Sequence, residues 1–315
     1  MARGAIPASP LPQRGGIDAV RLRMPQSGPW TSLRDHLVER IPLAPDEIDR
    51  MLAAGEFADS AGMPLAPDAP FVPRSVVWVH REPAPEVPVP FTVPVLHRDE
   101  RIVVVDKPHF LATTPRGQHV RETVLTRLRV ELGLPRLAPA HRLDRLTAGV
   151  LVLTTEQRWR GAYQGLFAAG AVAKDYLACA PVRAELDLPT TVRVHLSKPR
   201  GSLQARVDPG GTPNSETAIE LLARGADSRT SRLGLYRLRP LTGRTHQLRV
   251  TLAWLGIPIA GDPLYPVVRE VAADDFSTPL GLVASRLAFT DPLDGTPREF
   301  VSGRLPPPWS TPTGH

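Results

Sequence analysis

Residues 141–149 read HRLDRLTAG and run directly into the apolar stretch VLVL at residues 150–153. A continuous apolar run of this length predicts a buried strand, so we expect Asp144 on a loop that enters the core. Because Arg142 and Arg145 flank it, the carboxylate of Asp144 should stay ionised. Such a carboxylate can attack a sugar carbon, stabilise positive charge on a sugar ring or accept a proton. A structural salt bridge at the strand entrance explains the same residues equally well.

A second segment, residues 241–249 (LTGRTHQLR), concentrates cationic side chains at the predicted start of a helix. Thr245 is predicted to cap this helix, because it follows a glycine turn and leucines recur after it at helical spacing. His246 and Arg249 are three residues apart and share one side of the helix start, while Arg244 lies on the turn. This arrangement suits a phosphate or a carboxylate. A surface helix with solvated charges is the simpler interpretation of the segment alone.

Two further segments carry polar or aromatic side chains at defined places. The turn at residues 256–265 (GIPIAGDPLY) contains two glycines and two prolines. Asp262 and Tyr265 are predicted to close this turn, and a catalytic role for Asp262 is the less favoured interpretation. Residues 174–176 (KDY) open a predicted strand, in which Tyr176 is either a core aromatic or a lid against a substrate ring.

From about residue 95 onward, predicted helices and strands follow one another without regular alternation. This favours an α+β domain with a mixed, largely antiparallel sheet and flanking helices over a doubly wound fold. The predicted strands cover residues 102–105, 149–155, 176–180, 191–196 and 236–239, and the predicted helices cover 122–132 and 159–169.

The chain is predicted to contain a small N-terminal domain between two flexible segments. Residues 1–28 are rich in Pro, Gly and Arg and predict a mobile basic tail. Residues 29–92 are expected to form the small domain, with a first helix capped by Thr31. Residues 93–304 form the main domain, and residues 305–315 are a Pro-rich tail.

Length and composition describe a globular protein with a basic surface. The chain has 315 residues, 42% hydrophobic and 22% charged, and its single cysteine, Cys179, excludes an intrachain disulfide. No apolar stretch is long enough to span a bilayer and no signal peptide is visible, so we expect a cytoplasmic protein without membrane contact. We expect a monomer. The net charge is +6, with Arg far more frequent than Lys. Arginine suits phosphate binding, although codon bias in a GC-rich genome produces the same excess.

In their order and spacing, these segments resemble the RluA-type pseudouridine synthases. The resemblance rests on residues 141–153, 174–176 and 243–265, and the segment VDKP at residues 105–108 is similar to the family's opening strand. It covers about residues 95–300 and implies the pseudouridine synthase fold.

Some positions depart from the family pattern. Leu146, Ala148 and Thr251 replace residues that are more usual there, and none of them removes a group that the chemistry needs. Residues 29–92 loosely resemble the alpha-L RNA-binding motif that often precedes this domain. The tight glycine turn expected after its second helix is replaced by residues 59–62 (DSAG), which weakens the match.

The resemblance implies an isomerase that converts uridine to pseudouridine in ribosomal or transfer RNA. Such an enzyme breaks the glycosidic bond and rejoins the base through carbon. Asp144 would be the catalytic carboxylate, with Arg249 as the arginine that pairs with it. Tyr176 would be the tyrosine that packs on the target base and takes part in proton transfer. No cofactor or metal is implied, because the reaction involves no redox change.

The resemblance also implies contacts with a structured RNA. Arg142 would fill the gap left by a nucleotide that is flipped out of its stack, since the reacting atoms are inaccessible within a stack. Lys107, Arg244 and His246 would contact the RNA backbone or support the site.

Two alternatives compete with this interpretation. One is a non-catalytic RNA-binding protein on the same scaffold, which would be expected to lack the carboxylate. The other is a glycosidic hydrolase, which normally needs a second carboxylate as a general acid. Asp106 and Asp262 are the candidates for that second group.

Overall fold

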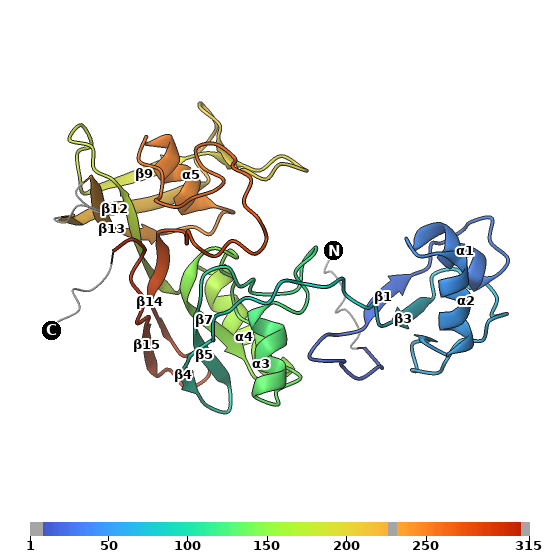
Figure 1. Ribbon diagram of the computed structural model, residues 1–315. Coiled ribbons are helices and arrows are strands. Elements are labelled where there is room, and N and C mark those ends of the chain that lie inside the picture. The colour runs from blue at the N-terminus through green and yellow to red at the C-terminus, as the bar shows by residue number, and fades with distance from the viewer. Residues whose placement is uncertain (1–8, 226–231, 310–315) are drawn as a thin grey trace. The chain divides into compact units, whose positions relative to one another are not determined.

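The computed structural model describes residues 9–225 and 232–309. The chain forms two compact units, Met1–Pro85 and Glu86–His315, which we call the N-terminal unit and the main unit (Figure 1). None of the described helices is long and apolar enough to cross a membrane.

The N-terminal unit packs two helices against a small antiparallel sheet. Leu37 from the first helix and Ile48 and Leu52 from the second are almost fully buried in its core. The elements are β1 (Val20–Arg23), α1 (Leu33–Arg40), α2 (Pro45–Ala53), β2 (Phe57–Ala58) and β3 (Val76–Val79), with the strand order β1-β3-β2.

Strand β1 lies within residues 1–28, where we predicted a mobile tail, and the prediction is wrong for this strand. Four residues are too few for a periodic pattern to stand out in a segment rich in Pro and Gly, yet all four pair with β3. Residues 1–8 of the predicted tail lie outside the described residues. The cap of α1 is Ser32 instead of Thr31, because the Ser32 hydroxyl accepts the backbone N–H of Asp35.

The main unit is built on one mixed sheet, which confirms the predicted fold class. Every described pairing within this sheet is antiparallel except that of β7 with β14. The strands are β4 (Val95–Arg98), β5 (Ile102–Lys107), β6 (Ala138–Pro139), β7 (Ala148–Thr154), β8 (Ala173–Pro181), β9 (Thr190–Val194), β12 (Ser215–Arg224), β13 (Leu233–Pro240), β14 (Leu282–Thr290) and β15 (Pro297–Val301). Their order is β4-β5-β7-β14-β8-β13-β12-β9, with β6 beside β7 and β15 beside β14. A separate hairpin pairs β10 (Leu196–Ser197) with β11 (Arg206–Val207).

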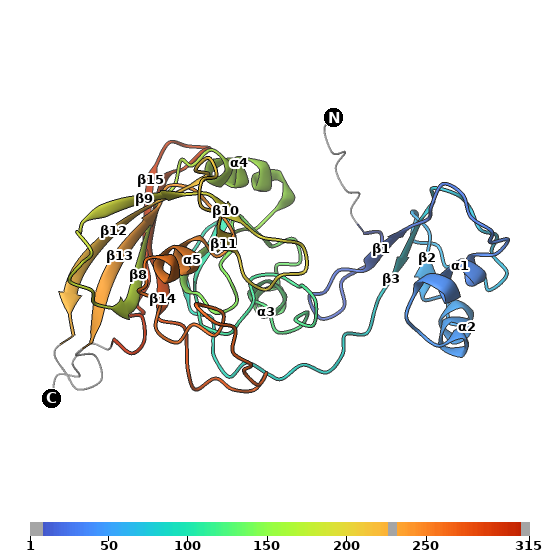
Figure 2. The ribbon, with the colours of Figure 1, turned by 90° about the horizontal axis from the view of Figure 1, so that it is seen from above.

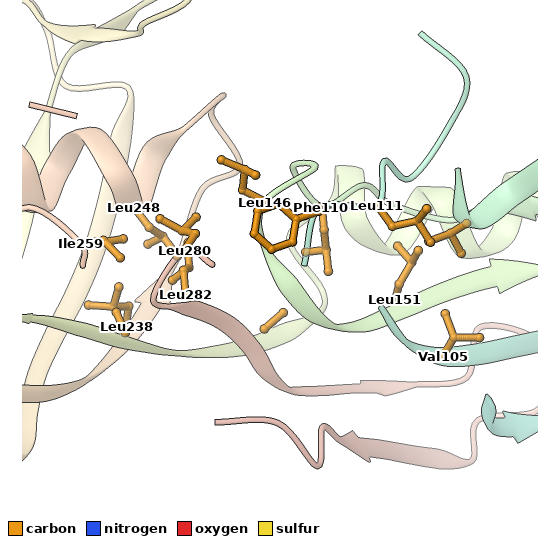
Figure 3. Packing of buried hydrophobic residues seen from close by; sticks show 14 of the residues in the cluster. Val105, Phe110, Leu111, Leu146, Leu151, Leu238, Leu248, Ile259, Leu280 and Leu282 are labelled. Carbon is orange, nitrogen blue, oxygen red and sulfur yellow. The ribbon is translucent and has the colours of Figure 1, made fainter. Parts of the chain in front are cut away.

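Helices flank this sheet (Figure 2). They are α3 (Val124–Glu131), α4 (Gln157–Ala168) and α5 (Gln247–Trp254). Val103 and Val105 of β5 belong to the same buried cluster as residues of α3 and α5, seen at close range in Figure 3. Ile102 and Val104 pack instead with Tyr163 of α4. Both faces of β5 and β7 are therefore covered, which explains their continuous apolar sequences.

The loop that carries Asp144 connects β6 to β7 and ends where β7 pairs with β14. Gly149 has a φ of +111°, and a Cβ at this position would lie 2.2 Å from the carbonyl oxygen of Ala284. Only glycine fits this close approach. Gly149, the last residue of the HRLDRLTAG segment, therefore lets β7 approach β14, and this strand pairing positions the Asp144 loop.

The described part of the Pro-rich end lies against the main unit. Pro306 is buried, and its carbonyl oxygen is 3.5 Å from the sulfur of Cys179, a buried free thiol. Residues 310–315 of the predicted tail lie outside the described residues.

Candidate active site

A cavity of about 680 Å³ lies in the main unit at the segments singled out in the sequence. Its walls come from the β6–β7 loop, strand β8 and the turn that leads into α5. Six of the seven predicted site residues line it, namely Arg142, Asp144, Tyr176, Arg244, His246 and Arg249. The fold thus brings together side chains from three distant parts of the chain.

Asp144 is a partly exposed carboxylate in the wall of this cavity. Its Oδ2 atom is 3.6 Å from Nη1 of Arg249 and 3.9 Å from Nε2 of His246. The hydroxyl of Thr113 bonds to both backbone groups of the preceding residue, Leu143, and holds the loop in place. Asp144 is therefore an anchored anion that faces two nitrogen atoms.

Arg249, which is 2% exposed, makes its hydrogen bonds with Asp262. The Nε–Oδ2 and Nη2–Oδ1 distances are 2.8 and 2.7 Å. The expected pairing of Arg249 with Asp144 is present as an ion pair through Nη1, while the hydrogen bonds of Arg249 go to Asp262. Asp262 also closes its turn, since Oδ1 accepts the N–H groups of Leu264 and Tyr265. Burial lowers the pKa of Arg249, but the hydrogen bonds and charge of Asp262 raise it more, so the guanidinium is charged.

Tyr176 lies on β8 and lines the same cavity as Asp144. Burial and the charge of Asp144 both raise the pKa of this phenol above its usual range. The phenol is therefore protonated near neutral pH. The structure places a neutral aromatic ring in the same cavity as the anion, and its contact with a base stays a prediction.

His246 begins α5 with a left-handed backbone, at a φ of +56°. Thr245 is not the cap that we predicted, because α5 starts at Gln247 and His246 is its N-cap residue. The side chain of Gln247 accepts the N–H of Arg244 and the hydroxyl of Thr242. Burial lowers the pKa of His246 to about 4, so the ring is neutral near pH 7.

Lys107 is fully buried and lies away from the cavity surface. Its ammonium donates to the carbonyl oxygens of Pro108, Leu111 and Arg145 at 2.9, 2.7 and 3.1 Å. Burial lowers the pKa of Lys107 to about 7, while the charge of Asp144 favours the ammonium form. A phosphate cannot reach this buried side chain, so of the two roles expected for Lys107 the RNA contact is wrong and the supporting role fits the structure. Lys107 supports the Asp144 loop through the carbonyl of Arg145.

Basic side chains surround the single anion of the cavity. Arg142 and Arg244 are exposed at its walls, as expected of residues that meet a polyanion. Arg116 and Lys198 also line the cavity, and our sequence analysis missed them because each lies in a loop without a recognisable motif. Among the described residues that line the cavity, Asp144 is the only carboxylate.

Comparison with known proteins identifies the family of this chain. The model of the RNA pseudouridylate synthase family matches residues 101–254. The chain is 31% identical over 212 residues to the dual-specificity RNA pseudouridine synthase RluA of Yersinia pestis, which covers 65% of this chain and 96% of that protein. It is 36% identical over 192 residues to human pseudouridylate synthase RPUSD2, covering 59% of this chain and 33% of the human protein. The yeast mitochondrial tRNA pseudouridine(32) synthase is 33% identical over 190 residues, covering 59% of this chain and 39% of that protein.

Two solved structures share the fold. Human RNA pseudouridylate synthase domain containing 1 superposes with a TM-score of 0.55 at 24% identity, over 68% of this chain and 84% of that one. Human RNA pseudouridylate synthase domain containing 4 gives a TM-score of 0.50 at 25% identity, over 68% and 89%. The main unit therefore has the fold of these two proteins. The chain belongs to the RluA-type family of RNA pseudouridine synthases. It spans about a third of the human RPUSD2 and two fifths of the yeast relative.

Proposed function

We propose that this chain is an RNA pseudouridine synthase, an isomerase that converts uridine to pseudouridine within an RNA strand. The observation that carries the proposal is the position of Asp144. It is the only carboxylate among the described cavity residues, and it lies 3.6 Å from the guanidinium of Arg249. Membership of the RluA-type family supports the same activity.

The geometry suits the chemistry of this isomerisation. The bond between C1′ of ribose and N1 of uracil breaks, a bond from C1′ to C5 forms, the hydrogen at C5 leaves as a proton, and N1 gains a proton. Positive charge develops on the sugar as the first bond breaks, and Asp144 stabilises that charge or adds to the sugar. Arg249 places a positive charge beside the carboxylate and fixes its direction. Tyr176 packs on the target base.

The substrate that we propose is a structured ribosomal or transfer RNA, bound by the main unit of a single chain. Exposed Arg142 enters the space left by the flipped nucleotide, and the basic cavity lining neutralises phosphates. Described residues 9–85 of the N-terminal unit contain eight arginines and ten acidic residues. This charge balance does not favour phosphate binding, so we assign RNA binding to the main unit.

The positions of the other carboxylates weigh against a glycosidic hydrolase. Asp262 is fully buried in its ion pair with Arg249. Asp106 is also buried, and its carboxylate accepts hydrogen bonds from Ser302, Gly303 and Arg304. Neither group can donate a proton to a leaving group in the cavity, whereas an isomerase retains the base and needs no such acid.

The experiment that tests the proposal follows tritium release from structured RNA labelled at C5 of uridine. We expect the wild-type protein to release tritium, and Asp144→Asn to bind the RNA without releasing any. Arg158→Ala, an exposed change on α4 outside the cavity, is the matched control and should release tritium like the wild type. Release by Asp144→Asn would contradict the assigned role of the carboxylate.

A further inference from the structure

A line of polar contacts runs from the loop between β10 and β11 to Asp144. The backbone N–H of Ala205 donates to the hydroxyl of Tyr265 at 2.6 Å, and this hydroxyl lies 2.9 Å from Nδ1 of His246. The other ring nitrogen of His246, Nε2, is 3.9 Å from Oδ2 of Asp144. Arg249 faces the same carboxylate oxygen.

The hydroxyl of Tyr265 decides which nitrogen of His246 carries the proton. Its oxygen already accepts the N–H of Ala205, and among the described residues Nδ1 of His246 is the acceptor within reach of its proton. A buried hydroxyl with an unpaired proton would be unfavourable, so the O–H donates to Nδ1. In a neutral imidazole, Nε2 then carries the N–H.

We propose that Tyr265 is a positioning residue that holds His246 as the Nε2–H tautomer, so that this N–H donates to Oδ2 of Asp144 when RNA is bound. The inference rests on the proposed function and names two residues that act through Asp144. His246 and Arg249 hold one carboxylate oxygen from two directions and leave Oδ1 to face the nucleoside. A distance of 3.9 Å is too long for a hydrogen bond, and such contacts often shorten when substrate binds.

The surroundings of His246 favour the neutral ring that this role requires. Burial is the main cause of its lowered pKa of about 4. Burial also raises the pKa of Tyr265 to about 12, so the hydroxyl keeps its proton. The charged side chains around His246 are Arg249 and Lys198, which oppose its protonation, and Asp144 and Asp262, which favour it.

Nitrogen-15 spectra of the full-length protein with labelled histidine test the tautomer without RNA. We expect Nδ1 of His246 to be unprotonated and Nε2 protonated, and we expect Tyr265→Phe to populate the other tautomer. Tyr236→Phe is the matched control, because it removes a hydroxyl that donates to the carbonyl of Pro181 outside the cavity. It should leave the His246 signals unchanged. A protonated Nδ1 in the wild-type protein would overturn the proposal.

Two substitutions of His246 then distinguish its role as a hydrogen-bond donor from a purely structural role of its left-handed backbone. His246→Gln places an amide N–H near the position of Nε2, whereas His246→Asn places it near Nδ1. The left-handed backbone at this position suits Asn better than Gln, so a purely structural role favours His246→Asn. We expect His246→Gln to react about tenfold faster than His246→Asn at saturating RNA, with equal RNA affinity. A rate for His246→Asn equal to or above that of His246→Gln overturns the proposal.

Tritium release also measures how much the hydroxyl of Tyr265 contributes to the reaction rate. Tyr265→Phe should slow single-turnover tritium release about tenfold while RNA affinity stays the same, and Tyr236→Phe should keep the wild-type rate. An equal loss in both variants would show that only stability had changed and would overturn the positioning role. If the wild-type protein forms no pseudouridine, the proposed function fails, while the tautomer spectra still decide the state of His246.

Discussion

Arg249 and Asp262 form a buried ion pair with two hydrogen bonds, of 2.8 and 2.7 Å. Two nitrogen atoms of the guanidinium are thus fixed by Asp262, and the third, Nη1, faces Asp144 at 3.6 Å. Because the guanidinium is planar, Asp262 sets the direction from which Arg249 approaches the carboxylate. Asp262 is therefore part of the site although it does not line the cavity.

Asp262→Asn should destabilise the protein and abolish most of its activity. Loss of one partner leaves the buried charge of Arg249 uncompensated, which costs about 3–5 kcal/mol of unfolding free energy. Urea unfolding measures this loss. Glu299→Gln, which removes an exposed partner of Arg286, is the control and should change stability by about 1 kcal/mol or less. Near-wild-type stability of Asp262→Asn would mean that the pair does not hold Arg249.

Gly149→Ala should prevent the normal junction of β7 and β14. The new Cβ would lie 2.2 Å from a backbone oxygen, and the φ of +111° is unfavourable for alanine. We expect little soluble protein or a large drop in melting temperature. The control is Gly165→Ala on α4, where nothing lies within 4 Å, and it should stabilise the protein by about 0.5–1 kcal/mol. Equal melting temperatures for the two variants would refute the steric argument.

The strand and the loop that contain the site are predicted from the sequence more accurately than the side-chain contacts within the site. The run VLVL at residues 150–153 forms a buried strand because both sheet faces are covered, and the loop before it carries Asp144 as expected. The bond between Arg249 and Asp262 joins a helix to a turn, and residue spacing alone does not specify such a tertiary contact. The sequence left open whether Lys107 contacts RNA or supports the site, because buried lysines are rare and its three carbonyl acceptors come from loops that residue spacing does not bring together.

Stability should fall as the pH is lowered from about 6.5, in part because of His141. Its Nε2 accepts the backbone N–H of Val152 and its ring stacks on Phe167, and burial lowers its pKa to about 3. Between pH 3 and 6.5, His141 is therefore protonated in the unfolded chain but neutral in the folded protein. Because the unfolded state binds this extra proton, lowering the pH favours unfolding.

The variant His141→Phe keeps an aromatic ring but cannot titrate. We expect it to be less stable than the wild type at pH 7, because the N–H of Val152 loses its partner. Its unfolding free energy should fall less steeply than that of the wild type between pH 7 and 4.5. Identical slopes for the two proteins, measured by urea unfolding, would exclude His141 as a source of the pH dependence.

Arg142→Ala should slow the reaction on structured RNA more than the reaction on unstructured RNA. A side chain that enters the gap left by a flipped nucleotide helps only where a base must leave a stack. We expect the rate on a folded stem-loop to fall about tenfold or more and the rate on an unpaired oligonucleotide to change little. Arg158→Ala serves again as the control for loss of an exposed positive charge. Equal losses on both RNAs would assign Arg142 to phosphate binding instead.

If Asp144 and its cavity isomerise uridine in RNA, the purified protein must form pseudouridine in an RNA strand. The most direct test is nucleoside analysis by mass spectrometry of structured RNA incubated with the purified full-length chain. We expect pseudouridine to appear in step with tritium release, the RNA strand to stay intact and no uracil to be set free. Free uracil, or tritium release without pseudouridine, would contradict it.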